Sequence, residues 1–282
     1  MALYVNSNST SLLTQRYLSK NTDGYTKSLE RLATGYRINR AADDAAGLAV
    51  SEGLITVTRG NAQAMKNIQD GVNMMQIAEG TLEIIGDNLQ RIRELSVQAA
   101  NGTYATLERN AMLAEIKERI TEITRISETS SYNKVPLLSM DATSIVLQIG
   151  TTSGNNSILD IKNAFGTINS TTLDIELTDV TAEDWKDNAT VRAYLDKLDS
   201  AIATVSERRG LIGAYQNRIE GAYDNLQVMS ENITEANSRI RETDIAQETS
   251  TSTRFQILQQ ASASVLVQVN QQASVALQLL QG

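Results

Sequence analysis

The chain has 282 residues, of which 41% are apolar and only 4% aromatic, with a single proline and a net charge of −8. It has no cysteine and no histidine, which excludes a disulfide framework, a thiolate nucleophile, an imidazole base and a histidine-centred metal site. The acidic balance argues against nucleic acid as a partner, because phosphate binding requires a basic stripe.

The two ends of the chain differ from its middle in charge. Residues 1–40 contain six Lys or Arg against two acids, residues 141–200 contain four against ten, and no charged residue follows Arg254. No apolar run is long enough to span a membrane, and residues 1–20 lack the basic segment and apolar core of a cleavable signal. Taken alone, these features would indicate a cytoplasmic protein.

The first predicted helix lies near the N-terminus and carries an apolar stripe. Its members are spaced by seven, four, three and four residues, which is typical of one helix face. They are Leu18, Tyr25, Leu29, Leu32 and Tyr36.

A coiled-coil seam is predicted from residue 68 to residue 99, because apolar residues recur there in steps of three and four. The same spacing resumes at Leu113 and continues through Ile123, after a break at Asn101 and Gly102. A helical hairpin is therefore expected. The first seam consists of Ile68, Val72, Met75, Ala78, Leu82, Ile85, Leu89, Ile92, Leu95 and Ala99.

A small β patch is predicted in the middle of the chain. Ile145, Leu147 and Ile149 alternate with polar residues, and Leu173, Ile175 and Leu177 alternate again after a turn-rich stretch. Thr181, Ala182, Glu183 and Asp184 resemble a capping box for the long helix that follows, with an irregular start near Asn188.

The C-terminal half predicts one very long helix, because apolar residues recur every seven positions from residue 198 to residue 240. A helix of roughly fifty residues would be about 75 Å long and would need partners along its length. The repeat consists of Leu198, Val205, Ile212, Ile219, Leu226, Ile233 and Ile240, with Ala201, Tyr215, Ala222, Met229 and Ala236 three residues further on.

The last segment predicts a helix that is apolar on more than one side and therefore needs burial on more than one side. Isolated helices gain little stability without tertiary packing. We therefore expect both ends to be largely disordered in the monomer and to fold when neighbouring subunits surround them. The C-terminal stripe is Leu258, Ala261, Val265, Val269, Ala273, Ala276 and Leu280, widened by Leu266, Val267, Leu277 and Leu279.

No residue pattern indicates catalysis, a cofactor or a metal. Asp43 and Asp44 are better explained as helix-start residues than as an acid/base or metal pair. Gly47 and Gly53 have neither the spacing nor the preceding strand of a nucleotide-binding loop. The charged residues around Arg91 are typical of a solvated helix face. An enzyme that uses only Asp, Glu, Lys and Tyr is left open by composition, but no constellation points to one.

Four separated segments resemble the bacterial flagellins. Residues 31–48 (RLATGYRINRAADDAAGL) are similar to the N-terminal signature of that family, and residues 88–101 (NLQRIRELSVQAAN) to its first long helix. Residues 238–248 (SRIRETDIAQE) resemble its C-terminal signature, and residues 268–280 its closing segment. The resemblance covers nearly everything except about residues 141–190.

The resemblance implies a mainly α protein: an elongated coiled-coil helical rod with a small β-hairpin element and paired N- and C-terminal helices. It divides the chain into a core helix at 1–42, rod helices at 43–140, a hairpin region at 141–180, a rod helix at 181–249 and a core helix at 250–282. The core helices would form the inner core of a filament. The expected self-assembly residues are Leu18, Tyr25, Leu29, Leu32, Tyr36, Leu258, Val265, Val269, Ala276 and Leu280.

The resemblance also implies a structural subunit that polymerises with itself for swimming motility. Further implied partners are the hook-filament junction and cap proteins, an export chaperone and the type III export apparatus, which would pass the chain unfolded to the cell exterior without a cleaved signal. The filament would be extracellular, or periplasmic in a spirochaete. By the same resemblance, Arg91, Leu95 and Glu115 lie in a contact surface for the vertebrate Toll-like receptor for flagellin.

Two positions depart from the family pattern. Residues 132–138 (YNKVPLL) replace a commoner Phe-Asn-Gly form, which affects a turn, and Gln272 and Ala273 stand where many relatives have proline, which extends the terminal helix. The rival interpretations are a hook-filament junction protein, which usually has proline where Ala45 stands, and an intracellular coiled-coil scaffold, which would not need a charge-free tail after Arg254.

Overall fold

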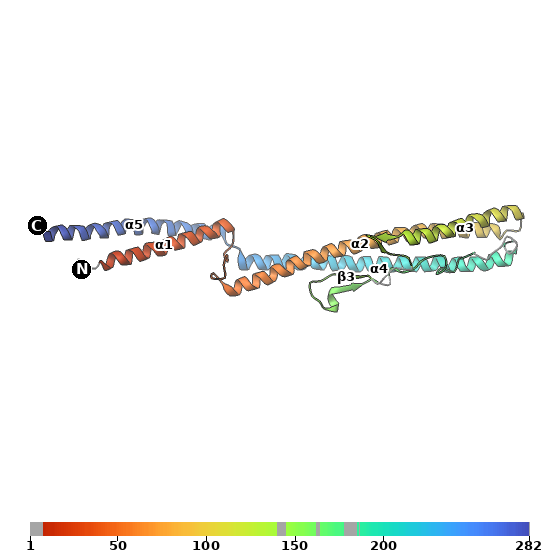
Figure 1. The fold of residues 1–282 in the computed structure, drawn as a ribbon, viewed down its shortest axis with the longest axis horizontal. Coiled ribbons are helices and arrows are strands. Elements are labelled where there is room, and N and C mark those ends of the chain that lie inside the picture. The colour runs from red at the N-terminus through yellow and green to blue at the C-terminus, as the bar shows by residue number, and fades with distance from the viewer. Residues whose placement is uncertain (1–7, 140–144, 162–163, 178–184, 186, 282) are drawn as a thin grey trace. The chain divides into compact units, whose positions relative to one another are not determined.

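A computed structural model describes residues 8–139, 145–161, 164–177, 185 and 187–281, with the backbone alone for Asn188, 273–274 and 276–281. Figure 1 shows that the described chain is mainly helical, as predicted. Its helices are α1 (Ser9–Thr34), α2 (Ala45–Ala99), α3 (Thr106–Thr129), α4 (Asn188–Arg241) and α5 (Ile245–Gln281). Its strands are β1 (Ser131–Tyr132), β2 (Val135–Pro136), β3 (Val146–Gln148) and β4 (Ile158–Asp160), with a 3₁₀ turn at Asn155–Ser157.

The chain forms two compact units. The terminal unit consists of residues 1–56 and 232–282, and the central unit consists of residues 57–231. The long helices α2 and α4 contribute to both units. None of the helices in the described ranges is long and apolar enough to cross a membrane.

The central unit is built on the apolar seam that the sequence predicts. Every predicted seam residue of α2 is buried except Val72, which is half-buried against the core. On α4, the repeat positions Leu198, Val205, Ile212, Ile219 and Leu226 are buried, which confirms that this part of the seven-residue repeat faces the core, whereas Ile233 and Ile240 are only half-buried. The positions three residues further on, from Ala201 to Ala236, are not buried along their whole length, because Met229 is 43% exposed.

Side-chain contacts show that α3 and α4 each run antiparallel to α2 in the central unit. Arg91 Nε of α2 lies 3.3 Å from Glu115 Oε1 of α3, which confirms the predicted hairpin. A second contact joins α2 to α3, between Asn88 and Arg119 at 3.0 Å. Two contacts join α2 to α4, between Arg93 and Asp199 at 2.6 Å and between Glu79 and Gln216 at 3.0 Å. In both pairs of helices, later residues of α2 contact earlier residues of the partner helix. At the α2–α3 turn, Arg109 Nη2 donates to the Asn101 carbonyl at 3.1 Å.

The predicted β patch is only partly formed. β3 and β4 pair antiparallel, with Leu147 opposite Leu159 and both side chains buried. Leu147 packs against α2 at Gly71, where an added Cβ would lie 2.3 Å from the leucine Cδ1. Figure 1 shows this hairpin beside the long helices.

The alternation at residues 173–177 does not form a strand, so that part of the prediction is wrong. Leu173, Ile175 and Leu177 are all buried, but the segment is a turn followed by irregular backbone. Asp174 has a φ of 52°, which breaks an extended course, and the Ile175 carbonyl accepts a hydrogen bond from Tyr194 Oη at 2.9 Å. Burial, rather than strand pairing, explains the alternating pattern.

A second hairpin, β1–β2, was not predicted as a strand pair. Its two-residue turn places Asn133 at φ 47° and Lys134 at φ 67°, the left-handed region that hairpin turns of this length require. The departure from the family pattern at residues 132–138 therefore leaves a lysine in a conformation that glycine adopts more readily.

Local capping explains where several helices begin and end. Asn8 Oδ1 accepts from the Ser11 N–H at the start of α1, and Gly35 (φ 73°) ends that helix in the left-handed conformation. Asp187 Oδ1 accepts from the Ala189 N–H at the start of α4, whereas the predicted capping box at 181–184 lies outside the described residues. α5 continues through Gln272 and Ala273, as expected without a proline there.

Candidate functional site

The candidate site is the pair of terminal helices, α1 and α5, which lie side by side in Figure 1. They run antiparallel, because contacts near the start of α1 reach the far part of α5 and contacts near its end reach the start of α5. Ser11 Oγ lies 2.9 Å from Asn270 Oδ1, and Arg31 Nη1 lies 3.6 Å from Glu248 Oε2. The predicted pairing of the two terminal helices is confirmed.

The contact face between α1 and α5, here called the terminal seam, follows a heptad spacing, but about half of its residues are polar. Its members are buried or half-buried side chains of each helix, and they recur in steps of three and four. On α1 they are Thr14, Leu18, Asn21, Tyr25, Ser28 and Leu32; on α5 they are Glu248, Ser252, Phe255, Gln259, Ser262, Leu266 and Val269.

Specific hydrogen bonds cross the terminal seam. Asn21 Nδ2 donates to Ser262 Oγ at 2.9 Å, and Gln259 Nε2 donates to Thr22 Oγ1 at 3.0 Å. Beside the seam, Arg31 Nε and Glu248 Oε1 are buried without a hydrogen-bond partner among the described residues, although these two residues face each other. A hydrogen bond contributes only about 1 kcal/mol net, and unsatisfied buried atoms subtract from that, so the polar contacts of the terminal seam stabilise the isolated pair only weakly.

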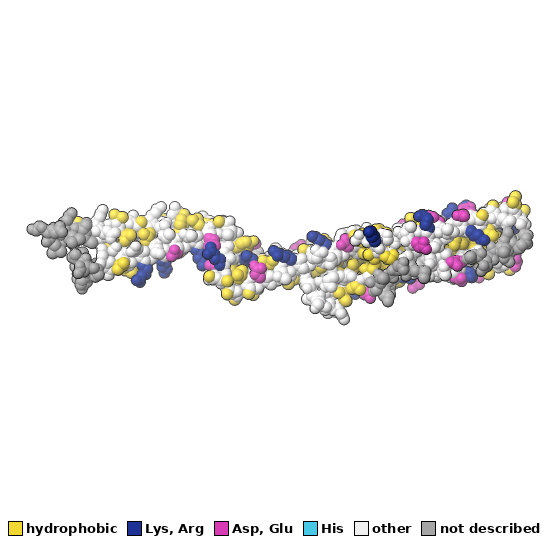
Figure 2. Space-filling model, viewed as in Figure 1, with side chains coloured by type: hydrophobic (Ala, Val, Ile, Leu, Met, Phe, Trp, Pro, Cys, Tyr) yellow, Lys and Arg dark blue, Asp and Glu magenta, His cyan; other side chains and the backbone are white. Residues whose placement is uncertain are grey.

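Large apolar side chains of α1 and α5 face outward instead. Leu12 is 64% exposed, Tyr17 54%, Ile257 60% and Val267 57%. Figure 2 shows hydrophobic side chains on the surface of this unit. Exposed large apolar side chains of this kind are typical of a surface that contacts a partner.

The predicted self-assembly residues fall into groups. Leu18, Tyr25, Leu32 and Val269 belong to the terminal seam and are half-buried, whereas Leu29, Leu258 and Val265 face outward with 44%, 41% and 48% exposure. Tyr36 lies beyond the end of α1, so its place on the helical stripe was wrong, because Gly35 ends the helix. The side chains of Ala276 and Leu280 lie outside the described residues.

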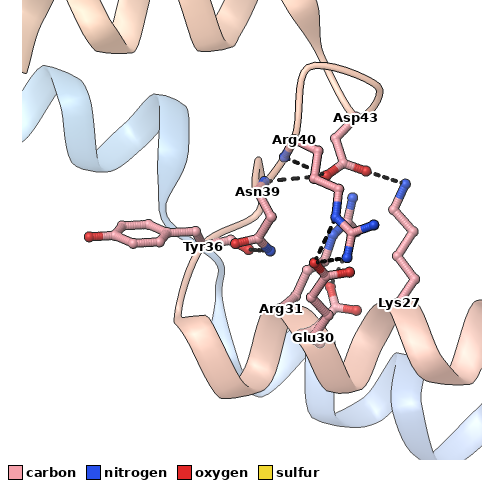
Figure 3. A network of polar contacts seen from close by, with 8 residues as sticks. Lys27, Glu30, Arg31, Tyr36, Asn39, Arg40 and Asp43 are labelled. Carbon is pink, nitrogen blue, oxygen red and sulfur yellow. Dashed lines mark hydrogen bonds and ion pairs between the residues drawn. The ribbon is translucent and has the colours of Figure 1, made fainter.

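A compact turn at residues 35–44 follows α1 (Figure 3) and is organised around one carboxylate. Asp43 Oδ2 accepts from the backbone N–H groups of Asn39 and Arg40, each at 3.2 Å, and Asp43 Oδ1 lies 2.6 Å from Lys27 Nζ. Arg40 in turn contacts Glu30 at 2.9 Å. The adjacent Asp44 accepts from the Gly47 N–H at the start of α2. The helix-start interpretation is confirmed for Asp44, whereas Asp43 instead accepts from N–H groups of the preceding turn.

The contacts of Asp43 stabilise its charged form. Its hydrogen bond with Lys27 and the two backbone N–H groups outweigh the opposing effect of burial and lower the pKa of the carboxyl to about 2. Asp43 therefore stays ionised at any pH near neutrality, where it holds the turn.

The two connections of the terminal unit, one after α1 and one between α4 and α5, are bonded to each other. Arg37 N–H donates to the Arg241 carbonyl at 2.7 Å, and Thr243 N–H donates to the Gly35 carbonyl at 2.9 Å. Tyr36 and Glu242 form an antiparallel bridge. The Arg241 guanidinium lies 4.7 Å from the centre of the Tyr36 ring, a cation–π contact. Figure 3 shows the Tyr36 ring directed away from the carboxylates.

The residues predicted to contact a receptor lie on α2 and α3. Arg91 pairs with Glu94 at 3.1 Å and with Glu115 at 3.3 Å, and these hydrogen bonds raise the pKa of the Arg91 guanidinium. Leu95 is only 3% exposed and belongs to the core of the central unit. Of the three residues, only Arg91 and Glu115 present side chains that a partner could reach.

Two regions of the sequence match a known family. Residues 5–143 match the bacterial flagellin N-terminal helical region, and residues 195–280 match the bacterial flagellin C-terminal helical region. The chain is also 39% identical to a flagellin of Halalkalibacterium halodurans over 87% of this chain and 88% of that protein. The chain belongs to the bacterial flagellin family. As a flagellin, it is a structural subunit of the flagellar filament.

Other relatives indicate which kind of flagellin this is. A flagellar filament 30.7 kDa core protein of Treponema maltophilum is 38% identical over 87% of this chain and 88% of that protein. The phase 2 flagellin of Salmonella typhimurium is 41% identical over 69% of this chain, but the match covers only 38% of that protein. Only residues 144–194 separate the two matched regions, so this flagellin is a short form without a large outer domain.

A solved structure has the same fold as this flagellin. It is described as a flagellar hook-associated protein from Vibrio parahaemolyticus, with a TM-score of 0.59, 16% identity, and coverage of 71% of this chain and all of that chain.

The polar residues of the terminal seam were not predicted from the sequence, because the prediction followed apolar residues only. The spacing of Asn21 and Ser28 on α1, and of Ser252, Gln259 and Ser262 on α5, could have revealed them.

Proposed function

We propose that this flagellin assembles into its filament through α1 and α5, which fold against neighbouring subunits after export of the chain in an unfolded state. The observation that carries the proposal is the inverted arrangement of the terminal pair. Its contact face carries as many polar as apolar side chains, while the large apolar side chains of Leu12, Tyr17 and Ile257 are more than half exposed. Burying such side chains between subunits contributes about 25 cal/mol per Å², and this gain offsets the entropy of ordering the ends.

The central unit does not need neighbours in the same way, because its seam is apolar and closed. We propose that the central unit, residues 57–231, folds alone after export and supplies most of the rod of each subunit. The proposed rod also includes the adjoining parts of α2 and α4, with the boundaries 43–140 and 181–249 for the rod helices and 141–180 for the hairpin region. Residues 1–42 and 250–282 supply the inner core. We further propose that the chain is exported without a cleaved signal, with the help of an export chaperone and the type III export apparatus. Junction and cap proteins would contact the ends of the filament, which would be extracellular or periplasmic.

Electron microscopy of the purified chain after seeding or salting out tests the assembly mechanism. The full-length protein should form filaments of uniform width, and a version ending at Arg254 should stay monomeric. Dimers or short bundles under every condition would instead favour a junction protein or an intracellular scaffold.

Point substitutions test whether assembly needs the outward apolar side chains of α5 or only the presence of the helix. Leu258→Ser with Val265→Ser removes two outward apolar side chains, and we expect the protein concentration needed for filament growth to rise by about tenfold or more. The matched control, Gln256→Ser with Gln260→Ser, changes two exposed polar positions of the same helix and should assemble normally. Equal assembly of both double variants would refute a role for the outward face.

A contact with the Toll-like receptor for flagellin is a second proposal, supported by the exposed pair of Arg91 and Glu115. Leu95 would act only through packing of the core. The double variant Arg91→Ala with Glu115→Ala should weaken receptor binding, and unchanged binding would exclude the proposal. Lys117→Ala, a charged change on the exposed surface of α3, provides the comparison.

A further inference from the structure

The terminal seam contains one contact of unusual closeness between an aromatic ring and a helix backbone. Phe255 is the only aromatic residue of α5, and its ring lies against Gly24 of α1. A Cβ added at Gly24 would lie 2.7 Å from both Cε1 and Cζ of that ring. The ring therefore occupies the space that any side chain at position 24 would need.

Directional contacts flank the ring on both sides. Asn21 with Ser262 and Thr22 with Gln259 form hydrogen bonds on one side, and the ion pair of Arg31 with Glu248 lies on the other. These contacts require one alignment of the two helices, whereas unspecific apolar packing would tolerate several.

A shift by one heptad is the obvious competing alignment, since seam positions repeat every seven residues, about 10 Å along a helix. In one direction the shift places Phe255 opposite Tyr17, and in the other opposite Arg31, where a side chain fills the position of the glycine hydrogen. Asn21 would then face Phe255 or Val269, neither of which offers a side-chain acceptor. Both shifts lose the amide hydrogen bond as well as the ring site.

We propose that Gly24 and Phe255 form a register key, which permits α1 and α5 of this chain to pair in one alignment only. The inference rests on the proposed assembly through these helices and adds the residues that specify their pairing. A fixed alignment matters because it presents the outward apolar side chains of both helices to neighbouring subunits in a constant pattern.

Gly24→Ala tests the key, because alanine is the better helix former and helix propensity alone would strengthen the pair. We expect the opposite, since the new methyl group displaces the ring. Gly24→Ala with Phe255→Ala should restore pairing by removing the clash. Gly53→Ala is the matched control in the same unit, because nothing lies within 4 Å of a Cβ added there.

Disulfide formation in filaments reports the alignment, because the chain has no cysteine of its own. The pair Ser11→Cys with Asn270→Cys reports the observed register, where the two side chains are 2.9 Å apart. The pair Ser11→Cys with Ala263→Cys, one heptad earlier on α5, reports the shifted register. A disulfide needs Cα atoms within about 7 Å, so one alignment cannot form both efficiently.

In the parent background we expect the first cysteine pair to cross-link at least about tenfold more than the second. Gly24→Ala should remove that preference or prevent assembly, and the double variant with Phe255→Ala should recover it; Gly53→Ala should leave it unchanged. The key is refuted if the parent forms filaments with the observed cross-link and Gly24→Ala behaves like Gly53→Ala, or if Phe255→Ala fails to rescue. A parent chain that forms no filaments at all would instead refute the proposed function.

Discussion

The seam of the central unit and the terminal seam share a heptad spacing but differ in chemistry. In the central unit, Leu82, Ile85 and Leu89 are completely buried among other aliphatic side chains. In the terminal seam the corresponding faces carry Asn21, Ser28 and Gln259. Helical periodicity fixes which face is buried, but only the residue types decide whether burial stabilises the isolated subunit.

The two seams differ in how much each buried contact contributes to the free energy of folding. Burying an aliphatic side chain fully contributes about 1.5–3 kcal/mol, whereas a hydrogen bond that replaces one with water contributes about 1 kcal/mol. The apolar seam of the central unit therefore contributes more stability per buried residue than the terminal seam, and we propose that contacts between subunits supply the difference for α1 and α5.

The change in seam chemistry occurs within α2 itself. From Ala64 onward its buried seam positions are mostly apolar, but before that point Ser51 and Asn61 are buried, with 0% and 1% exposure. Ser51 bonds to Asn237 of α4 at 2.7 Å. A single continuous helix thus carries both kinds of seam.

The largest expected effect comes from opening the apolar seam. Ile85→Ala should lower the free energy of unfolding of the central unit by about 3 kcal/mol, because it leaves a cavity in a fully buried layer. Urea unfolding followed by the fluorescence of Trp185 measures it, since this single tryptophan is completely buried in the same unit. Ile84→Ala, at the neighbouring 51% exposed position, should cost less than about 0.5 kcal/mol. Equal losses for the two variants would contradict the seam as the source of stability.

A smaller effect is expected in the terminal unit from Asp43. Asp43→Asn removes a charged acceptor from Lys27 and two backbone N–H groups and should cost about 1.5 kcal/mol in the assembled state. Filament dissociation, measured by sedimentation across a pH series, reports this loss.

The pH dependence of that contribution has a definite sign. The folded pKa of Asp43, about 2, lies below its ordinary value of 3.8, so the stabilisation is complete above about pH 4 and is lost as the pH falls toward 2. Asp43→Asn should therefore flatten this part of the dissociation curve. A variant whose acid dissociation matches that of the parent would show that Asp43 does not hold the turn.

A substitution at Asn61 tests the comparison of the two seams by raising, rather than lowering, the stability of the central unit. Its Nδ2 donor is buried without a hydrogen-bond partner in the described residues, so Asn61→Leu should raise the stability of the central unit by about 1 kcal/mol. Urea unfolding monitored by Trp185 applies again, with Gln63→Leu at an exposed position as the control. A loss of stability would mean that the asparagine is satisfied by water and belongs to a polar layer.

The sequence predicts the helices well because strong periodicity and a single proline leave few alternatives. The breaks at Asn101–Gly102 and at Gly35 are likewise readable from residue type, although the stripe ending in Tyr36 was carried one turn too far. The strand prediction at 173–177 was wrong because alternating burial arises in irregular backbone as well as in strands. The positive φ of Asp174 is the feature that distinguishes this segment from a strand.

The candidate site was harder to predict than the fold. Apolar residues predict α1 and α5 as assembly helices, but the sequence alone places Val265 and Val269 on one stripe. In the structure Val269 belongs to the terminal seam and Val265 is 48% exposed. The alignment of the two helices depends on which polar residues pair across more than 200 positions of sequence, which periodicity within one helix does not encode.

The smallest expected effect concerns the surface of the central unit. Arg93 Nε lies 2.6 Å from Asp199 Oδ1, but the two side chains are 42% and 54% exposed, so solvent screens the pair and side-chain entropy opposes it. Asp199→Asn should leave the urea midpoint unchanged within error, at low salt and at high salt alike. Arg93 and Ile85 both lie on α2 in the central unit, so the Asp199 and Ile85 variants compare surface charge with buried apolar contact in the same unit. A salt-sensitive loss as large as that of Ile85→Ala would mean that charges between the helices, rather than their apolar seam, hold the central unit together.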